Sequence, residues 1–375
     1  MSANVSKQSP FAWSLLLVFL GTAIHLVMGF STELSVDEAH YALYANHLAW
    51  SYFDHPPLVG WIQWPLVAIN APDGILRLIP ITLWIISCFL VYHIADQLDE
   101  YCTHRSLFIK APTPNNPSYA GLAAVAIIVF APLPHVLAVG LVPDSLLTPL
   151  SLGILWMSLQ WLKQDGQLSF YQWIGLGLLF GLAGLSKYTA ILYALAFAIA
   201  CLSVPRFTFL RQSGFYIAIA IALLLISPVL LWNAQYDWIS FKYQIDHGSG
   251  GDWLWRRLAA FLGIQLVVFG FLPILGLWAY SRMVGFAKRP FVSILLVFFI
   301  LPFSVFAALS GGGGLPHWTS PAWFCLAPIA GVGLSQWWQS GKHWLITLCL
   351  AVQGTLVVSG LTLVMTAGYP IASQF

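Results

Sequence analysis

A cluster of acidic, histidine and tyrosine residues between positions 35 and 58 has the composition and spacing of a catalytic surface. On a helix, Asp37, His40, Tyr41, Tyr44 and His47 would fall at i, i+3, i+4, i+7 and i+10, and so share one face. A carboxylate on such a face can accept a proton from an attacking hydroxyl group, while histidines and tyrosines can bind or orient a substrate. The segment therefore predicts general-base chemistry, with Asp37 as the base.

The local sequence also predicts where this helix begins and ends. Ser35 can act as N-cap, and Glu38 three residues later completes a capping box. The proline pair after Asp54-His55 cannot continue a helix. Each residue taken singly has a structural alternative: Glu38 as a cap partner, Asp37 as a charge favoured at a helix start, the tyrosines as residues of a membrane interface. Their combination on one face favours a functional site.

The composition places this site in a membrane protein. Hydrophobic residues make up 59% of the chain and charged residues only 7%, against about 25% charged in an ordinary soluble domain. The class is therefore an all-α polytopic membrane protein. A net charge of +2 without a basic tract gives no indication of nucleic-acid binding. The five cysteines are scattered, without the spacing of a metal site or a disulfide framework.

The apolar runs predict about 11 transmembrane helices, since about 17 to 25 residues are needed to span a bilayer. The first is too long for a signal peptide and is expected to be retained. The helix that carries Asp37 would lie on the membrane surface, with Val36 and Leu43 on its apolar face. The predicted spans are 11–31, 75–95, 118–138, 144–162, 171–186, 189–204, 214–232, 258–280, 291–309, 320–338 and 344–366.

The distribution of charge predicts which side of the membrane carries the chemistry. With the N-terminus inside, ten of the fifteen basic residues fall on the cytoplasmic side, as the positive-inside rule requires. The remaining five oppose the rule, so each is expected to have a specific use. Polar and aromatic residues gather in the outer loops 32–74, 233–257 and 310–319. No internal repeat and no separate soluble domain is recognisable, so residues 1–375 are predicted to form a single transmembrane domain. The five outer basic residues are Arg77, Lys187, Lys242, Arg256 and Arg257.

Five motifs, in order along the chain, resemble a known family. Asp-Glu-Ala-x-Tyr at 37–41, followed by the segment Tyr52–Trp61, resembles the first outer loop of the dolichyl-phosphate-mannose-protein mannosyltransferase-like group (glycosyltransferase families 39 and 83). The lipid A aminoarabinose transferase is a relative of this group. The later matches are Val142-Pro143-Asp144-Ser145-Leu146-Leu147, Gly181–Thr189, Leu231–Trp238 and Leu315-Pro316-His317-Trp318.

The resemblance implies a fold, a reaction and site residues. The fold is the GT-C glycosyltransferase fold, and the reaction transfers a monosaccharide from a polyprenyl-phosphate donor, with inversion. The catalytic aspartate of the family's first outer loop falls on Asp37 and its second acidic position on Asp144. The basic residue of the Pro-Pro turn, which contacts lipid phosphate in relatives, falls on His55. The aminoarabinose branch has arginine where His40 stands and lysine where His55 stands.

This reaction has requirements that other residues can meet. The leaving lipid phosphate gains charge as its bond to the sugar breaks, so it needs cations or hydrogen-bond donors. His55, Lys187, Arg256 and Arg257 are the predicted phosphate-binding residues. The inner loops are too short for a nucleotide-sugar domain and contain no P-loop, which favours a lipid-linked donor. The predicted substrate-binding residues are Glu38, His40, Tyr41, Asp54 and His317.

Several alternatives remain open from the sequence. No metal ligands are assigned and no cofactor is required, although a divalent metal is chemically possible at these acids and histidines. A lipid or sugar transporter or flippase is the main rival, but transporters place ionisable residues near the bilayer midplane. An O-antigen polymerase or ligase would share the lipid donor. The expected enzyme is a hexosyl- or pentosyltransferase of a bacterial inner membrane, acting on lipid A, another cell-envelope glycan or a protein at the periplasmic face.

Overall fold

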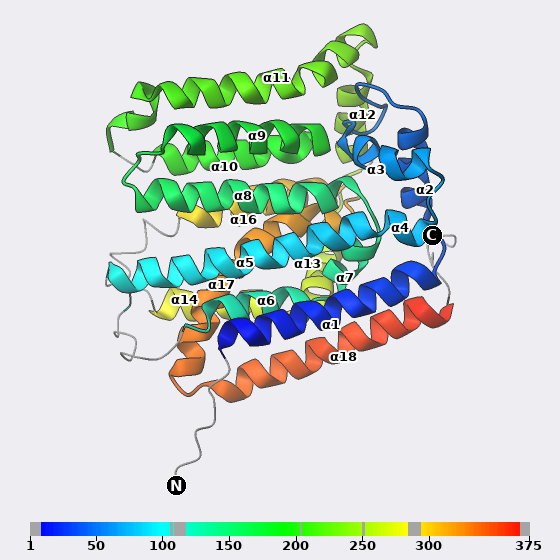
Figure 1. The fold of residues 1–375 in the computed structure, drawn as a ribbon. Helices are drawn as coiled ribbons and strands as arrows, with labels where there is room; N and C mark the ends of the chain where they lie inside the picture. The colour runs from blue at the N-terminus through cyan, green and yellow to red at the C-terminus, as the bar shows by residue number, and fades with distance from the viewer. Residues whose placement is uncertain are drawn as a thin grey trace.

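The chain folds into a bundle of long, roughly parallel helices (Figure 1). The computed structural model describes residues 9–105, 108, 118–202, 205–249, 252–283 and 294–367, and no β-strand occurs among them. Five helices are long and apolar enough to cross a membrane, and seven spans result if each of two bent helix pairs counts as one. The all-α membrane architecture is therefore confirmed. Every predicted span contains a helix, but some are short, so the count of eleven stays a prediction.

The first half of the chain supplies three of the long helices and most of the short outer ones. Its elements are α1 (Pro10–Ser31), α2 (Val36–Asn46), α3 (Leu58–Ala68), α4 (Asp73–Leu76), α5 (Leu78–His104), α6 (Ala120–Val129), α7 (Pro132–Val139), α8 (Pro143–Lys163) and α9 (Phe170–Ser186). The second half adds η1 (Tyr188–Ala190), α10 (Ile191–Leu202), η2 (Pro205–Arg211), α11 (Ser213–Gln235), α12 (Ile239–Ser249), α13 (Trp255–Phe269), α14 (Leu272–Met283), η4 (Ile294–Leu296), α16 (Val297–Ser310), η5 (Pro316–Thr319), α17 (Ser320–Gln339) and α18 (His343–Ala367).

Helix α17 forms the centre of the bundle. Almost all of its residues are buried, and it contacts α5, α6, α8, α14 and α16. Small residues allow this, because helices inside a membrane pack most closely where backbones touch. A Cβ atom on Gly333 would lie 2.0 Å from the carbonyl oxygen of Gly276 in α14. The central position of α17 thus depends on backbone contact that a larger residue would prevent.

Two predicted spans are broken rather than continuous. The pair α6–α7 bends by 74° and the pair α13–α14 by 89°. A break frees backbone groups that must find partners inside an apolar environment. The buried side chain of Gln353 on α18 serves both breaks: its Nε2 donates to the Phe130 carbonyl (3.1 Å), and its Oε1 accepts from the N–H groups of Phe271 (3.2 Å) and Leu272 (3.0 Å). Gly270, at φ +78°, has no room for a Cβ beside this glutamine.

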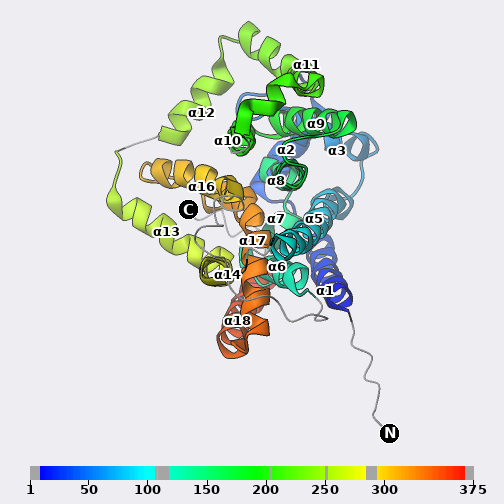
Figure 2. The ribbon, with the colours of Figure 1, turned by 90° about the vertical axis from the view of Figure 1, so that its left-hand side faces the viewer.

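The short outer elements gather at one end of the bundle. Figure 1 shows α2, α3, α4 and α12 together at the right-hand side, and Figure 2 shows α12 and α13 arching away from the other helices. At the opposite end, Arg105 follows α5 and pairs with Asp165 after α8 (3.3 Å). Lys7, Lys110, Lys288 and Arg289 of the predicted inner side lie outside the described residues.

Candidate functional site

Asp37 lies in the first turn of α2, two residues after the N-cap. The predicted capping box is confirmed: Ser35 Oγ accepts from the Glu38 N–H (3.3 Å), and Glu38 Oε2 accepts from the Ser35 N–H (2.9 Å). Asp37 is exposed, and within the described part of the chain its carboxylate makes no hydrogen bond or ion pair. It interacts electrostatically with Tyr41 and His317. Asp37 is therefore a carboxylate that a substrate hydroxyl can reach.

The predicted polar face of this helix is only partly solvent-exposed. Tyr41 and Tyr44 are buried, at 7% exposure each, while Val36 and Leu43 on the other face are 67% and 55% exposed. The tyrosine rings pack with apolar residues of α3 and of the segment that leads into α8, because the tyrosine side of α2 lies against the protein. Asp37 and His40 stay exposed. The apolar side faces outward, as expected for a helix at a membrane surface.

Asp54 is the centre of a polar network between the first outer loop and α12. Its carboxylate accepts a hydrogen bond from the Tyr44 hydroxyl and lies 3.2 Å from His40 Nε2, which is also 3.2 Å from the Tyr44 hydroxyl. The Tyr52 ring stacks on Tyr44 with centroids 3.6 Å apart. Gln244 of α12 donates to the Asp54 carbonyl. Each Asp54 carboxylate oxygen thus has a protein partner, and the predicted substrate residue His40 lies directly beside it.

Tyr41 and His55 lie next to each other below this network. Their ring centroids are 5.8 Å apart. Burial, together with the negative charges of Asp54 and Asp37, raises the pKa of the Tyr41 hydroxyl. The phenol therefore stays protonated and can donate a hydrogen bond to a substrate oxygen or to a phosphate.

Glu38 has a different partner from the substrate predicted for it. Its two carboxylate oxygens lie 2.8 Å from Arg77 Nε and 3.0 Å from Arg77 Nη2, and both side chains are buried. Glu38 Oε2 also accepts from the Ser35 N–H, so each carboxylate oxygen of Glu38 has at least one protein donor. A buried ion pair therefore uses the charge of Glu38, and its predicted substrate-binding role stays a prediction.

Asp144 and Lys187 form a second buried ion pair. Asp144 lies in the first turn of α8, and Lys187 follows the last residue of α9, where an extended backbone ends that helix as predicted. The Lys187 ammonium lies 2.8 and 2.6 Å from the two Asp144 oxygens. Asp144 was predicted to be catalytic and Lys187 to bind phosphate. In this arrangement each charge neutralises the other, so each group has the other as its partner.

His317 joins the two acidic positions. Its Nε2 lies 3.8 Å from Asp144 Oδ2, and it also interacts electrostatically with Lys187 and Asp37. Burial lowers the pKa of the imidazole below 6.5, and the Lys187 charge acts in the same direction. Gln265 of α13 holds the surrounding turn by donating to the Pro316 carbonyl (3.2 Å). His317 therefore lies beside Asp144, and its predicted substrate-binding role stays a prediction.

Arg256 and Arg257 lie away from these acids. Both are exposed in the first turn of α13. Arg257 donates to the carbonyl oxygens of Asp252 (3.1 Å) and Gly312 (3.3 Å), so it supports the glycine-rich loop. Their predicted contact with a donor phosphate stays a prediction.

The sequence reasoning missed a hydrogen-bond network beside Lys187. The Tyr188 hydroxyl lies 3.2 Å from Ser51 Oγ and accepts from Asn233 Nδ2 (3.4 Å). Asn233 accepts from the Ser240 N–H (3.2 Å), and the Ser240 hydroxyl donates to the Tyr52 carbonyl (2.7 Å). Asn233 lies in the motif Leu231–Trp238, directly after an apolar run, and this position is the sequence feature that could have indicated the network. This network ties the first outer loop, η1 and α12 to one another.

A cavity of about 710 Å³ lies between α9, α10 and α11. It extends from Trp173, near the start of α9, to Tyr188, which directly follows Lys187. At 1.5 Å per helical residue this is a length of about 20 Å. Apolar side chains line it almost throughout, among them Phe180, Phe197, Phe215 and Phe241. Such a cavity suits a hydrocarbon chain whose polar end lies near Lys187.

The described residues contain no group of three or more His, Cys, Asp or Glu side chains arranged to hold a metal ion. Asp54 has His40 and Tyr44 as partners, and Asp144 has Lys187 and His317. The acids are therefore paired with donors and cations rather than gathered around a shared centre.

Three comparisons with known proteins find matches to this chain: a family model, a curated relative and solved structures. The sequence model of the dolichyl-phosphate-mannose-protein mannosyltransferase family matches residues 54–232, which include Asp54, His55, Asp144 and Lys187 and begin after Asp37. The lipid A galacturonosyltransferase RgtD of Rhizobium johnstonii is 25% identical over 347 residues, covering 89% of this chain and 68% of that protein.

Two solved structures of ArnT from Cupriavidus metallidurans superpose on this fold. The apo structure and the structure bound to undecaprenyl phosphate each give a TM-score of 0.60 at 19% identity. They cover 86% and 90% of this chain, and the chain spans 60% and 64% of the ArnT chains. Together with the capped outer helix and its acidic residues, these matches confirm the predicted resemblance: the chain has the GT-C fold, and its sequence is similar to the mannosyltransferase family model and to RgtD.

Proposed function

We propose that this protein is a glycosyltransferase that moves a monosaccharide from a polyprenyl-phosphate donor to a hydroxyl group of a cell-envelope acceptor, with inversion at the anomeric carbon. Its relative RgtD acts on lipid A, so a glycolipid of that class is the proposed acceptor. The reaction takes place at the end of the bundle where α2, α3 and α12 lie, which we assign to the periplasmic face of a bacterial inner membrane.

One observation carries this proposal. Of the four acids of the predicted site, Glu38 is bound by Arg77, Asp54 by Tyr44, and Asp144 by Lys187. Asp37 alone among these four is exposed and has no hydrogen bond or ion pair in the described structure. A general base must be in reach of the proton that it removes. Asp37 meets this requirement, and the other three acids are held by neighbouring side chains.

The proposed step uses Asp37 and the donors around it. The Asp37 carboxylate accepts the proton of the acceptor hydroxyl, whose oxygen forms a bond to the anomeric carbon. The bond from that carbon to the phosphate oxygen breaks, and its electron pair leaves with the lipid phosphate. Fixed donors near the leaving group stabilise the charge that develops on it. Tyr41, which interacts electrostatically with Asp37 and whose ring lies next to His55, is a suitably placed donor, and Lys187 precedes Tyr188 of the apolar cavity.

The cavity supports a lipid-linked donor. An apolar cavity of about 710 Å³ that reaches Tyr188, the residue after the buried Lys187, fits a polyprenyl chain with its phosphate outermost. The ArnT neighbour was solved with undecaprenyl phosphate bound. A flippase would share such a cavity, but it would have no use for an unpaired carboxylate at the outer surface.

Reconstitution tests this function directly. Purified protein in liposomes is supplied with radiolabelled undecaprenyl-phosphate monosaccharides and with lipid A, and labelled lipid A is measured. Transfer that requires both lipids and is lost in Asp37→Asn supports the proposal. Movement of labelled donor across the bilayer without any transfer would identify a flippase instead.

A further inference from the structure

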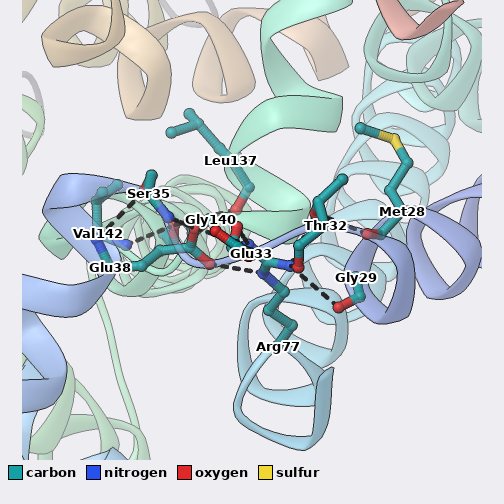
Figure 3. Close-up of polar contacts among 11 residues, drawn as sticks. Met28, Gly29, Thr32, Glu33, Ser35, Glu38, Arg77, Leu137, Gly140 and Val142 are labelled. Carbon is teal, nitrogen blue, oxygen red and sulfur yellow. Dashed lines mark hydrogen bonds and ion pairs between the residues drawn. The ribbon is translucent and has the colours of Figure 1, made fainter. Parts of the chain in front are cut away.

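Arg77 uses all three nitrogen atoms of its guanidinium group in contacts with the protein. It follows α4, is 1% exposed, and its guanidinium binds Glu38 through Nε (2.8 Å) and Nη2 (3.0 Å). Nη2 also donates to the Glu33 carbonyl (2.6 Å). Nη1 lies 3.0 Å from the Gly29 carbonyl, 2.6 Å from the Thr32 carbonyl and 2.9 Å from Thr32 Oγ1. Figure 3 shows these residues converging on the one guanidinium group.

These contacts join two helix ends. Gly29 and Thr32 belong to the C-terminal end of α1, where carbonyl groups lack helical partners and the helix dipole is negative. Glu38 belongs to the first turn of α2, where it closes the capping box with Ser35. A planar guanidinium with five N–H donors can serve both ends at once, which the ammonium group of a lysine cannot do. Arg77 therefore fixes the direction in which α2 leaves α1.

We propose that Arg77 is a positioning residue for the transfer reaction: through Glu38 it anchors the first turn of α2 and so holds the Asp37 carboxylate in the site. The inference rests on the proposed function, because it assigns Asp37 its role. Asp37 and Glu38 are adjacent in one helical turn, so a shift of that turn moves both. A displacement of about 1 Å at a reacting group can lower a rate by about 10²-fold.

The second acidic position is anchored in a different way, so Arg77 acts on Asp37 selectively. Asp144 lies in the first turn of α8, and the next residue, Ser145, supports the start of that helix with its side chain. The Ser145 hydroxyl accepts from the Val142 N–H (3.4 Å) and lies 3.1 and 3.2 Å from the carbonyl oxygens of Leu137 and Gly140, which Figure 3 also shows. Loss of Arg77 should therefore loosen α2 and leave α8 in place.

The test compares Arg77→Met, the double variant Arg77→Met/Glu38→Gln, and Arg105→Met. The double variant removes both buried charges, so no unpaired charge is left inside the protein, and glutamine can still close the capping box. Arg105→Met is the matched control, because it removes an exposed arginine at the other end of α5. Two experiments are made on folded, purified protein. Kinetics gives kcat and the donor KM of sugar transfer, and hydrogen exchange is followed in peptides from α2, α8 and α17.

We expect Arg77→Met and the double variant to lose about 10²-fold in kcat with little change in donor KM, and to exchange faster in α2 but not in α8 or α17. Arg105→Met should match the wild type. A double variant with wild-type kcat and a protected α2 would overturn the inference, as would faster exchange in α2, α8 and α17 alike or a failure of the double variant to fold. If the wild-type protein transfers no sugar, the proposed function fails, whereas exchange confined to α2 still reports whether Arg77 anchors that helix.

Discussion

Lys187, which follows α9, faces Asp144 at the start of α8, with the ammonium group 2.6 and 2.8 Å from the two carboxylate oxygens. Both side chains are buried, so each charge is neutralised mainly by the other. Removal of one partner of a buried pair leaves an uncompensated charge. Tyr188, the next residue after Lys187, lines the apolar cavity, and a donor phosphate that reaches Lys187 would compete with Asp144 for it.

The first prediction separates these two roles of Lys187. Lys187→Met should destabilise the protein by about 3 to 5 kcal/mol, because Asp144 loses its counter-charge. Lys187→Met/Asp144→Asn should recover most of this stability but still need more lipid donor for half-maximal transfer, since a phosphate loses a cation. Thermal unfolding and donor titrations of both variants measure the two effects. Normal donor dependence in the double variant would limit Lys187 to a structural role.

The second prediction concerns His317 and pH. Because burial holds its pKa below 6.5, the unfolded chain binds a proton more readily than the folded protein between the lowered value and 6.5. Stability should therefore rise with pH through this window and fall as the pH is lowered into it. His317→Gln should weaken that dependence. Melting temperatures of both proteins at pH 5, 6 and 8 test this, and parallel pH curves would contradict it.

The third prediction concerns the two broken helix pairs. Gln353→Leu removes the partner of the Phe130 carbonyl and of the Phe271 and Leu272 N–H groups. Each buried group left without a partner costs about 1 to 3 kcal/mol, so the loss should be several kcal/mol in total. Val358→Ala, at an exposed position of the same helix, is the control and should have little effect. Unfolding in detergent compares the two, and similar losses would show that the breaks do not depend on Gln353.

The helix starts and ends could be predicted from the sequence because their signals are local. The Ser35–Glu38 capping box and the break at Lys187 both occur where the residue types indicated them. The partners of the charged residues could not be predicted. Glu38 and Arg77 are 39 positions apart and Asp144 and Lys187 are 43 apart, and periodicity shows which face a side chain occupies but not what lies opposite.

The bends in the α6–α7 and α13–α14 pairs could not be predicted from the sequence for a related reason. The run that contains Gly270 is apolar on both sides of the break, so its composition resembles that of a continuous span. The partner that makes the break tolerable, Gln353, lies on α18, 82 positions beyond Phe271. The position of Arg77 against the positive-inside rule was a usable signal. It indicated a specific use for the charge without indicating that Glu38 was the partner.

The fourth prediction concerns sidedness. If the basic residues sort as the sequence indicates, a reporter fused after Arg105 should read as cytoplasmic and one fused after Asp246 as periplasmic. The two positions lie at opposite ends of the bundle, after α5 and within α12. Periplasmic signals from both fusions would contradict the assignment of the site to the outer face.

The last prediction is the loss of the base. Asp37→Asn keeps the size of the side chain but cannot accept the acceptor's proton, so sugar transfer should fall by about 10² to 10⁴-fold. The fold should survive, because Asp37 is exposed and has no partner in the described structure. Glu38→Gln, which the sequence alone suggests as a mild control, is unsuitable because it leaves the buried Arg77 charge unpaired. Glu33→Gln is the better control, since Glu33 is exposed and only its backbone carbonyl binds Arg77. Turnover per folded molecule decides the matter: a near-normal rate in Asp37→Asn would remove this residue as the base, and a rate lost equally in Glu33→Gln would point to the charge of the loop instead.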